Sequence, residues 1–156
     1  MALRKKTKIN KTGRTENEQF VKMSKWLISQ PAFVALSTTA KVLYIYIKMI
    51  AFGDHNGQVR MTVQEAAAAV GVSANTAAAA LHDLQAKGFL VLTTYGMLGV
   101  EGKRSSPLYG ITEYKIPPET VPRNSFLRWK PDHDFPVLRH KTNNPNGWNG
   151  KTHLKT

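Results

Sequence analysis

The sequence predicts an α+β domain in which helices pack on a small three-stranded antiparallel sheet. Residues 63–70 and 74–87 have the composition and periodicity of two helices, and only three residues separate them. Residues 89–95 and 108–116 are rich in β-forming side chains, which is typical of the two strands of a hairpin. A short third strand is expected over residues 58–61, after a turn-rich stretch.

The turn between the two predicted helices is the most informative feature of the chain. Gly71 supplies the left-handed backbone conformation that ends the first helix abruptly, and Ser73 offers its hydroxyl to the free N–H groups that begin the second. Val72, between them, is the apolar residue expected to hold the turn to the core. Two helices joined by so short a turn form a helix-turn-helix, which places its second helix in the major groove of DNA. A helical hairpin without a DNA role is the alternative.

The second helix of this motif has an inward and an outward face. Its core-facing residues are predicted to be Ala77, Ala80, Leu81 and Leu84. Asn75 is the expected bidentate partner of an adenine, and Thr76 of a phosphate or a base edge. Ala78 and Ala79 either allow a close approach to thymine methyl groups or are filler of high helix propensity. The predicted DNA-facing residues are Ser73, Ala74, Asn75, Thr76, Ala78, Ala79 and His82.

The loop of the predicted hairpin, residues 96–107, carries three glycines and, near its end, Lys103 and Arg104. Two cations on a hairpin loop suit contact with phosphates or with the minor groove. The hairpin is therefore predicted to be the wing of a winged helix-turn-helix. An ordinary solvated loop is the alternative.

Upstream, residues 38–52 are predicted to form a long apolar helix that Ser37 caps and Leu36 staples. One face, expected to pack under the helix pair, consists of Ala40, Leu43, Tyr44, Ile47 and Ile50. A second apolar stripe consists of Val42, Ile45, Tyr46 and Met49. It is covered either by a second subunit or by other parts of the chain, namely Trp26, Phe33 or residues 126–129. We favour a homodimer, which places two DNA-reading helices about one DNA turn apart.

Shorter helical pieces are expected over residues 20–29 and 32–34, broken by Pro31. Trp26, Leu27 and Phe33 within them are predicted core anchors, or part of the cover over the second stripe.

Several segments together resemble a group of winged helix-turn-helix proteins that is common in alphaproteobacterial genomes, phages, plasmids and integrative elements. They are FVKM at residues 20–23, WLISQPAF at 26–33, LSTTAK at 36–41, GVSANT at 71–76 and SPLY at 106–109. The resemblance spans residues 20–118 and implies a DNA-binding regulator or a replication-associated factor of a mobile element. Members of the group typically carry a bulky cation or polar residue where this chain has Ala78 and Ala79. This departure argues against extensive base readout by the middle of the helix.

The net charge of +12 is concentrated at the two ends of the chain. Residues 1–14 contribute +6, residues 15–119 contribute +1 and residues 120–156 contribute +5. Cations exchange condensed counterions for phosphate contacts and add affinity without sequence information. A merely solubilising terminus is the alternative. The N-terminal residues expected to reach DNA are Arg4, Lys5, Lys6 and Lys8.

We divide the chain into a basic, flexible N-terminal arm (residues 1–19), a winged helix-turn-helix domain (20–119) and a basic, proline-containing C-terminal extension (120–156). Two apolar patches in the extension, residues 126–129 and 135–138, are expected to pack either on the domain or on a partner.

Catalysis has little support in the sequence. Carboxylates such as Glu113 and Glu119 sit alone, mostly on predicted surfaces, and the candidate cluster of His133 with Asp132 and Asp134 lies in a proline-rich segment that is expected to be a solvated turn. There is no cysteine, and the glycines do not have phosphate-loop spacing. We therefore predict no enzymatic activity, no cofactor, no metal and no small-molecule ligand.

Without an apolar run of 18 residues or a signal peptide, the protein is expected in the cytoplasm, on the bacterial nucleoid rather than a membrane. The predicted function is sequence-specific binding of double-stranded DNA, as a transcriptional regulator or a replication-origin factor. The alternative is a non-specific architectural or assembly protein that uses its basic arms on nucleic acid.

Overall fold

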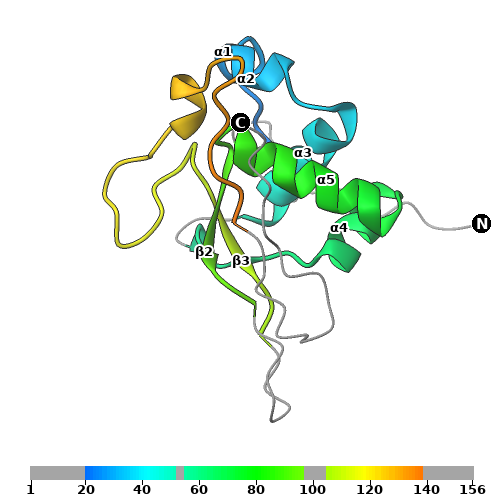
Figure 1. Cartoon of the computed structure of the whole chain (residues 1–156). Coiled ribbons are helices and arrows are strands. Elements are labelled where there is room, and N and C mark those ends of the chain that lie inside the picture. The colour runs from blue at the N-terminus through cyan, green and yellow to red at the C-terminus, as the bar shows by residue number, and fades with distance from the viewer. Residues whose placement is uncertain (1–19, 52–54, 97–104, 139–156) are drawn as a thin grey trace, which may run out of the picture.

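The computed structural model describes residues 20–51, 55–96 and 105–138. Over these ranges the helices and strands follow one another in the order that Figure 1 labels. They are α1 (Lys25–Ile28), α2 (Pro31–Val34), α3 (Thr38–Ile50), β1 (Val59–Arg60), α4 (Val63–Val70), α5 (Ala74–Ala86), β2 (Leu90–Thr94), β3 (Leu108–Ile111) and the 3₁₀ helix η2 (Ser125–Arg128).

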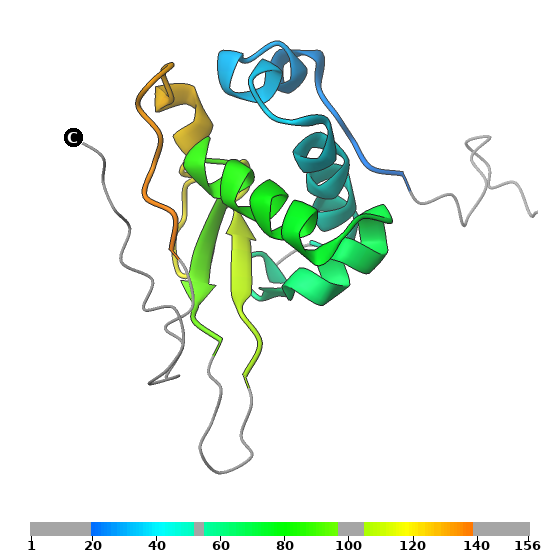
Figure 2. The same cartoon turned by 45° about the vertical axis from the view of Figure 1, so that its right-hand side comes forward.

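The three strands form one antiparallel sheet in the order β1-β3-β2. Leu90 pairs with Ile111 and Val59 pairs with Tyr109, so β3 lies at the centre. Figure 2 shows α3, α4 and α5 together on one side of this sheet, with α5 crossing in front of it. The prediction of an α+β fold with a small three-stranded antiparallel sheet is confirmed.

Several helices and strands are shorter than predicted. β3 ends at Ile111 and not at residue 116, because a turn follows in which Tyr114 N donates to Ile111 O over 3.3 Å. The long helix ends at Ile50 instead of residue 52, and α5 ends at Ala86 with Lys87 as its C-cap. Pro31 begins α2 as its first residue, where its missing N–H leaves no hydrogen bond unmade.

Side-chain caps set where the longer helices begin. The predicted caps are confirmed, since Ser37 Oγ accepts from Ala40 N and Ser73 Oγ accepts from Thr76 N, both over 3.2 Å. Thr62 and Glu65 form a full capping box at the start of α4, which was not predicted, although a Thr three residues before a Glu is the usual signature of this motif.

The core lies between α3, α5 and the sheet. Phe89 stacks on Phe126 with ring centroids 4.9 Å apart and meets Tyr44 edge-on at 5.2 Å. Leu27 and Phe33 are buried as predicted. Two expectations were wrong: Ile50 is 38% exposed at the last turn of α3, and Trp26 is 51% exposed, with an edge-to-face contact on Phe126.

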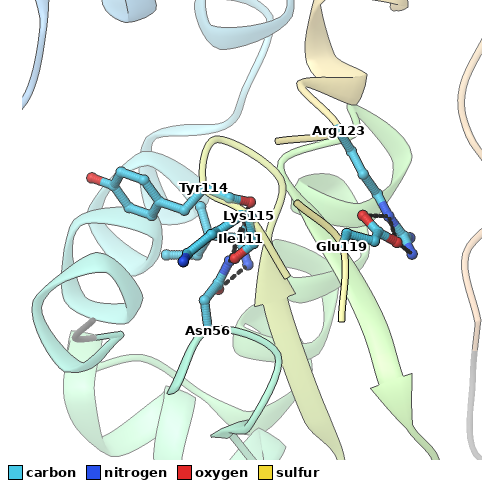
Figure 3. A network of polar contacts seen from close by, with 6 residues as sticks. All are labelled: Asn56, Ile111, Tyr114, Lys115, Glu119 and Arg123. Carbon is cyan, nitrogen blue, oxygen red and sulfur yellow. Dashed lines mark hydrogen bonds and ion pairs between the residues drawn. The ribbon is translucent and has the colours of Figure 1, made fainter. Parts of the chain in front are cut away.

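The turn after β3 is fastened to the domain by the buried side chain of Asn56 (Figure 3). Its Oδ1 accepts from Ile111 N over 2.8 Å, and its Nδ2 donates toward the carbonyl oxygens of Ile111, Tyr114 and Lys115, at 2.8, 3.3 and 3.0 Å. One side chain thereby satisfies backbone groups that a longer β3 would have paired.

A buried ion pair holds the same turn to α3. Lys48 Nζ lies 2.9 and 2.7 Å from the two carboxylate oxygens of Glu113, and the Tyr44 hydroxyl donates to that carboxylate over 2.7 Å. Burial and the Glu113 charge raise the pKa of Tyr44 well above its ordinary value. The expectation that Glu113 is an isolated surface acid was wrong.

Part of the C-terminal extension packs on the domain. Asn124 N donates to Thr112 O over 2.8 Å, and η2 then brings Phe126 into the core. Residues 130–138, which we call the C-terminal strap, run from η2 past the end of α5 and along β2, in orange in Figures 1 and 2. Phe135 N donates to Ala86 O over 2.7 Å, which joins the strap to the last turn of α5.

Candidate nucleic-acid interface

The connection between α4 and α5 has the predicted tight geometry. Gly71 adopts φ 74°, in the left-handed region, and both Gly71 N and Val72 N donate to Ala67 O. Val72 is partly buried against the core. The chain therefore reverses within residues 71–73, and Ser73 starts α5 with its hydroxyl 2.9 Å from that of Thr76.

The two faces of α5 divide as the helical spacing predicts. Its inward residues are buried, including Gln85 and Ala86 as well as the four predicted ones, Ala77, Ala80, Leu81 and Leu84. On the outward side, the exposed residues are Ser73, Asn75, Thr76 and Ala79, and the half-buried ones are Ala74, Ala78 and His82. Hydrogen-bonding side chains are thus offered at the N-terminal end of α5, and small apolar ones in its middle.

Asp83 joins α5 to the start of α3. Its Oδ2 accepts a hydrogen bond from Ser37 N, at the start of α3, over 2.8 Å, and its Oδ1 pairs with Lys87 one turn later. Burial opposes ionisation of this carboxyl, but the hydrogen bonds from Lys87 and Ser37 outweigh it, so the pKa of Asp83 lies below its ordinary value. The hydrogen bond from Ser37 therefore links α5 to the N-terminal end of α3.

The outward face of α5 carries little positive charge. The sequence has no Lys or Arg between Ser73 and Asp83, and Lys87 is engaged by Asp83 and by the ring of Trp129, whose centroid lies 5.7 Å away. Near the start of α4, Arg60 is paired with Glu65 over 2.9 Å. The described part of α5 therefore presents no Lys or Arg on its outward face.

The predicted cations of the interface lie outside the described residues. They are Lys103 and Arg104 of the hairpin loop and Arg4, Lys5, Lys6 and Lys8 of the N-terminal arm.

The second apolar stripe of α3 is largely uncovered within the described ranges. Val42, Ile45 and Met49 are 47, 42 and 43% exposed, and Tyr46 is half-buried. Phe33 packs on Tyr44 and Phe89 instead of this stripe. Trp26 contacts Phe126, and Phe126 stacks on Phe89 in the core.

The described residues hold no group of three His, Cys, Asp or Glu side chains placed to bind a metal ion. Asp134 of the His133 cluster accepts a hydrogen bond from Trp129 Nε1 over 2.7 Å, and His133 is exposed. Within the same ranges, none of the helices combines the length and the apolar character needed to cross a membrane.

Comparisons with protein-family models, with curated proteins and with solved structures found no match for this chain.

Proposed function

We propose that this protein is a winged helix-turn-helix that binds double-stranded DNA, with α5 in the major groove. The observation that carries the proposal is the capped, three-residue reversal between α4 and α5, which exposes Asn75 and Thr76 at the start of a helix anchored on a small sheet. The hairpin formed by β2 and β3 is the wing, and the N-terminal arm adds phosphate contacts. Together with the sequence resemblance, this favours a transcriptional regulator or a replication-origin factor of a bacterial mobile element.

A non-specific architectural role is the second candidate, and two observations favour it. The middle of the exposed face of α5 offers Ala78 and Ala79, which donate and accept no side-chain hydrogen bonds, and the charge excess lies at the ends of the chain. The ratio of affinity for a site selected from genomic fragments to affinity for random DNA separates the two roles. A ratio of ~10³ or more at physiological salt supports a specific regulator, and a ratio near one supports the architectural role.

Asn75→Ala tests base reading directly. We expect a loss of about 1–3 kcal/mol of discrimination at one base pair of the selected site, because a bidentate contact to adenine is removed. Affinity for random DNA should hardly change. Asn75 is exposed, so the melting temperature serves as the control for folding. Equal weakening on selected and random DNA argues against Asn75 as a base reader.

Deletion of residues 1–14 tests the N-terminal arm. Six positive charges are removed. Affinity should fall for every sequence, and the slope of log affinity against log salt should become shallower by up to about five. A slope identical to that of the full chain means that this arm does not contact DNA.

We further propose that two copies pair through the α3 stripe and so read two half-sites. Ile45→Glu should then give a monomer that still unfolds cooperatively and binds palindromic DNA weakly, because Ile45 is already 42% exposed in the single chain. Light scattering after gel filtration measures the mass. Val34→Glu is the matched control, since Val34 is a 64% exposed apolar residue on α2. A wild-type protein that is monomeric at tens of micromolar contradicts the dimer.

A further inference from the structure

A hollow of about 520 Å³ lies at the C-terminal end of α3, where three segments that are far apart in the sequence meet. They are residues 20–22, the last turn of α3, and the chain between β3 and η2. Figure 2 shows the first of these segments, in blue, running beside α3. The volume is within the range of pockets that hold small molecules.

The walls of this hollow are mainly apolar and include two aromatic rings. Phe20 is 80% exposed, Tyr114 is 37% exposed, and Met49 of α3 is 43% exposed. Lys48 Nζ lies 5.3 Å from the centroid of the Tyr114 ring, a cation–π contact that keeps this ring beside α3. Figure 3 shows the Tyr114 side chain extending from the turn after β3. A flat apolar group placed in the hollow would therefore bury its own surface and that of these side chains.

The charged groups that line the hollow are lysines. Lys22 and Lys115 are both exposed, and Lys22 forms no ion pair with another described residue. The described lining residues include no Asp or Glu. Glu113, which neutralises Lys48, is not among them, so this buried ion pair presents its lysine to the hollow. An anion bound here would thus meet two exposed ammonium groups and no carboxylate of the described lining.

We propose that this hollow binds a small aromatic anion, in which a carboxylate is attached to a flat ring system. The rings pack against Phe20, Met49 and Tyr114, and the carboxylate accepts hydrogen bonds from Lys22 and Lys115. A neutral ligand of the same shape loses the charged contacts, and a small anion without rings loses the apolar burial. No small-molecule ligand was predicted from the sequence, because these residues approach one another only in the fold.

The first test compares two probes that differ in charge. 1-Naphthoate is an anion at neutral pH, and 1-naphthalenemethanol carries the same rings without the charge. Each is titrated into the isotope-labelled full chain, without DNA, while amide NMR shifts are followed. We expect naphthoate to give saturable shifts at Val21, Met49 and Tyr114 and to bind about fivefold or more tightly than the alcohol. Equal affinities, or shifts confined to the α3 stripe, refute the site.

Substitution of the two lysines tests the charged contacts. Lys22→Gln with Lys115→Gln should weaken naphthoate binding about five- to tenfold, because two exposed ion pairs with the carboxylate are lost, and should leave the alcohol unaffected. The matched control, Lys25→Gln with Lys130→Gln, removes the same charge from exposed residues that do not line the hollow, and naphthoate should bind it as it binds the wild type. Equal weakening by both pairs means that naphthoate senses only the net charge, which refutes the site.

Phe20→Ala tests the apolar wall. It should weaken both probes, whereas Leu127→Ala, which removes a 47% exposed apolar side chain on η2, should weaken neither. The melting temperature controls for folding in every variant. A wild-type chain that binds neither probe also refutes the site. None of these measurements involves DNA, so their outcome leaves the proposed function to its own tests.

Discussion

Replacing Glu113 by alanine is expected to destabilise the fold by about 3–5 kcal/mol, because a buried ammonium loses its only counter-charge among the described residues. The Lys48 side chain is 3% exposed and that of Glu113 16%, so water cannot solvate Lys48 in place of the carboxylate. The Tyr44 hydroxyl loses its acceptor in the same step. Urea unfolding followed by circular dichroism measures the change as a lower midpoint at constant slope.

Two further variants make this prediction specific to a buried pair. Glu119→Ala removes another carboxylate paired with a cation, but Glu119 and Arg123 are 36 and 41% exposed, so the midpoint should hardly move. Lys48→Met combined with Glu113→Leu removes both charges and should recover most of the loss. A Glu113→Ala protein as stable as Glu119→Ala would contradict the buried pair.

The parts of the fold that follow from local chain chemistry were predictable. Gly71, Ser73 and Ser37 act through backbone conformation and hydrogen bonds to residues three or four positions away, so their signals lie within a few letters of sequence. The inward face of α5 followed in the same way from helical periodicity.

The long-range polar contacts were not predictable. Asn56 lies in a turn-rich stretch and bonds residues 55 to 59 positions away, and Lys48 meets Glu113 across 65 positions. Nothing in the neighbouring residues distinguishes such side chains from solvated ones. The end of β3 at Ile111 is a consequence, because Asn56 takes over the backbone groups that would have extended the ladder.

In the candidate interface, too, the features set by local sequence were predictable and those set by long-range contacts were not. Its α5 residues were predictable because they share one helix. The strap was predicted only as an apolar patch that packs either on the domain or on a partner. The hydrogen bond from Phe135 N to Ala86 O depends on the path of the chain after η2, which local sequence does not determine. The stripe on α3 is an exception, because the sequence already required a cover for it, and Val42, Ile45 and Met49 are exposed in the described part of the chain.

Gly88→Ala is expected to cost about 2–4 kcal/mol and to weaken the docking of the strap. Gly88 has φ 78° and closes α5 in a Schellman arrangement, in which Gly88 N donates to Gln85 O and Phe89 N donates to Leu84 O. A β-carbon there would lie 2.8 Å from the Phe135 ring and 2.9 Å from the backbone nitrogen of Phe126. The added methyl group is therefore disfavoured both by the left-handed backbone conformation and by the steric clash with Phe135 and Phe126.

Gly71→Ala separates these two causes. Gly71 has a similar φ of 74°, but a β-carbon there meets nothing within 4 Å. Only the left-handed backbone conformation should therefore lower the free energy of unfolding, by about 1–2 kcal/mol. The excess loss in Gly88→Ala then measures the packing of the strap and η2 against the end of α5. Adding Phe135→Ala to Gly88→Ala should show a favourable coupling, because one of the two clashes is relieved while that with Phe126 persists. Equal losses for Gly71→Ala and Gly88→Ala would mean that neither the strap nor η2 packs against the end of α5 in solution.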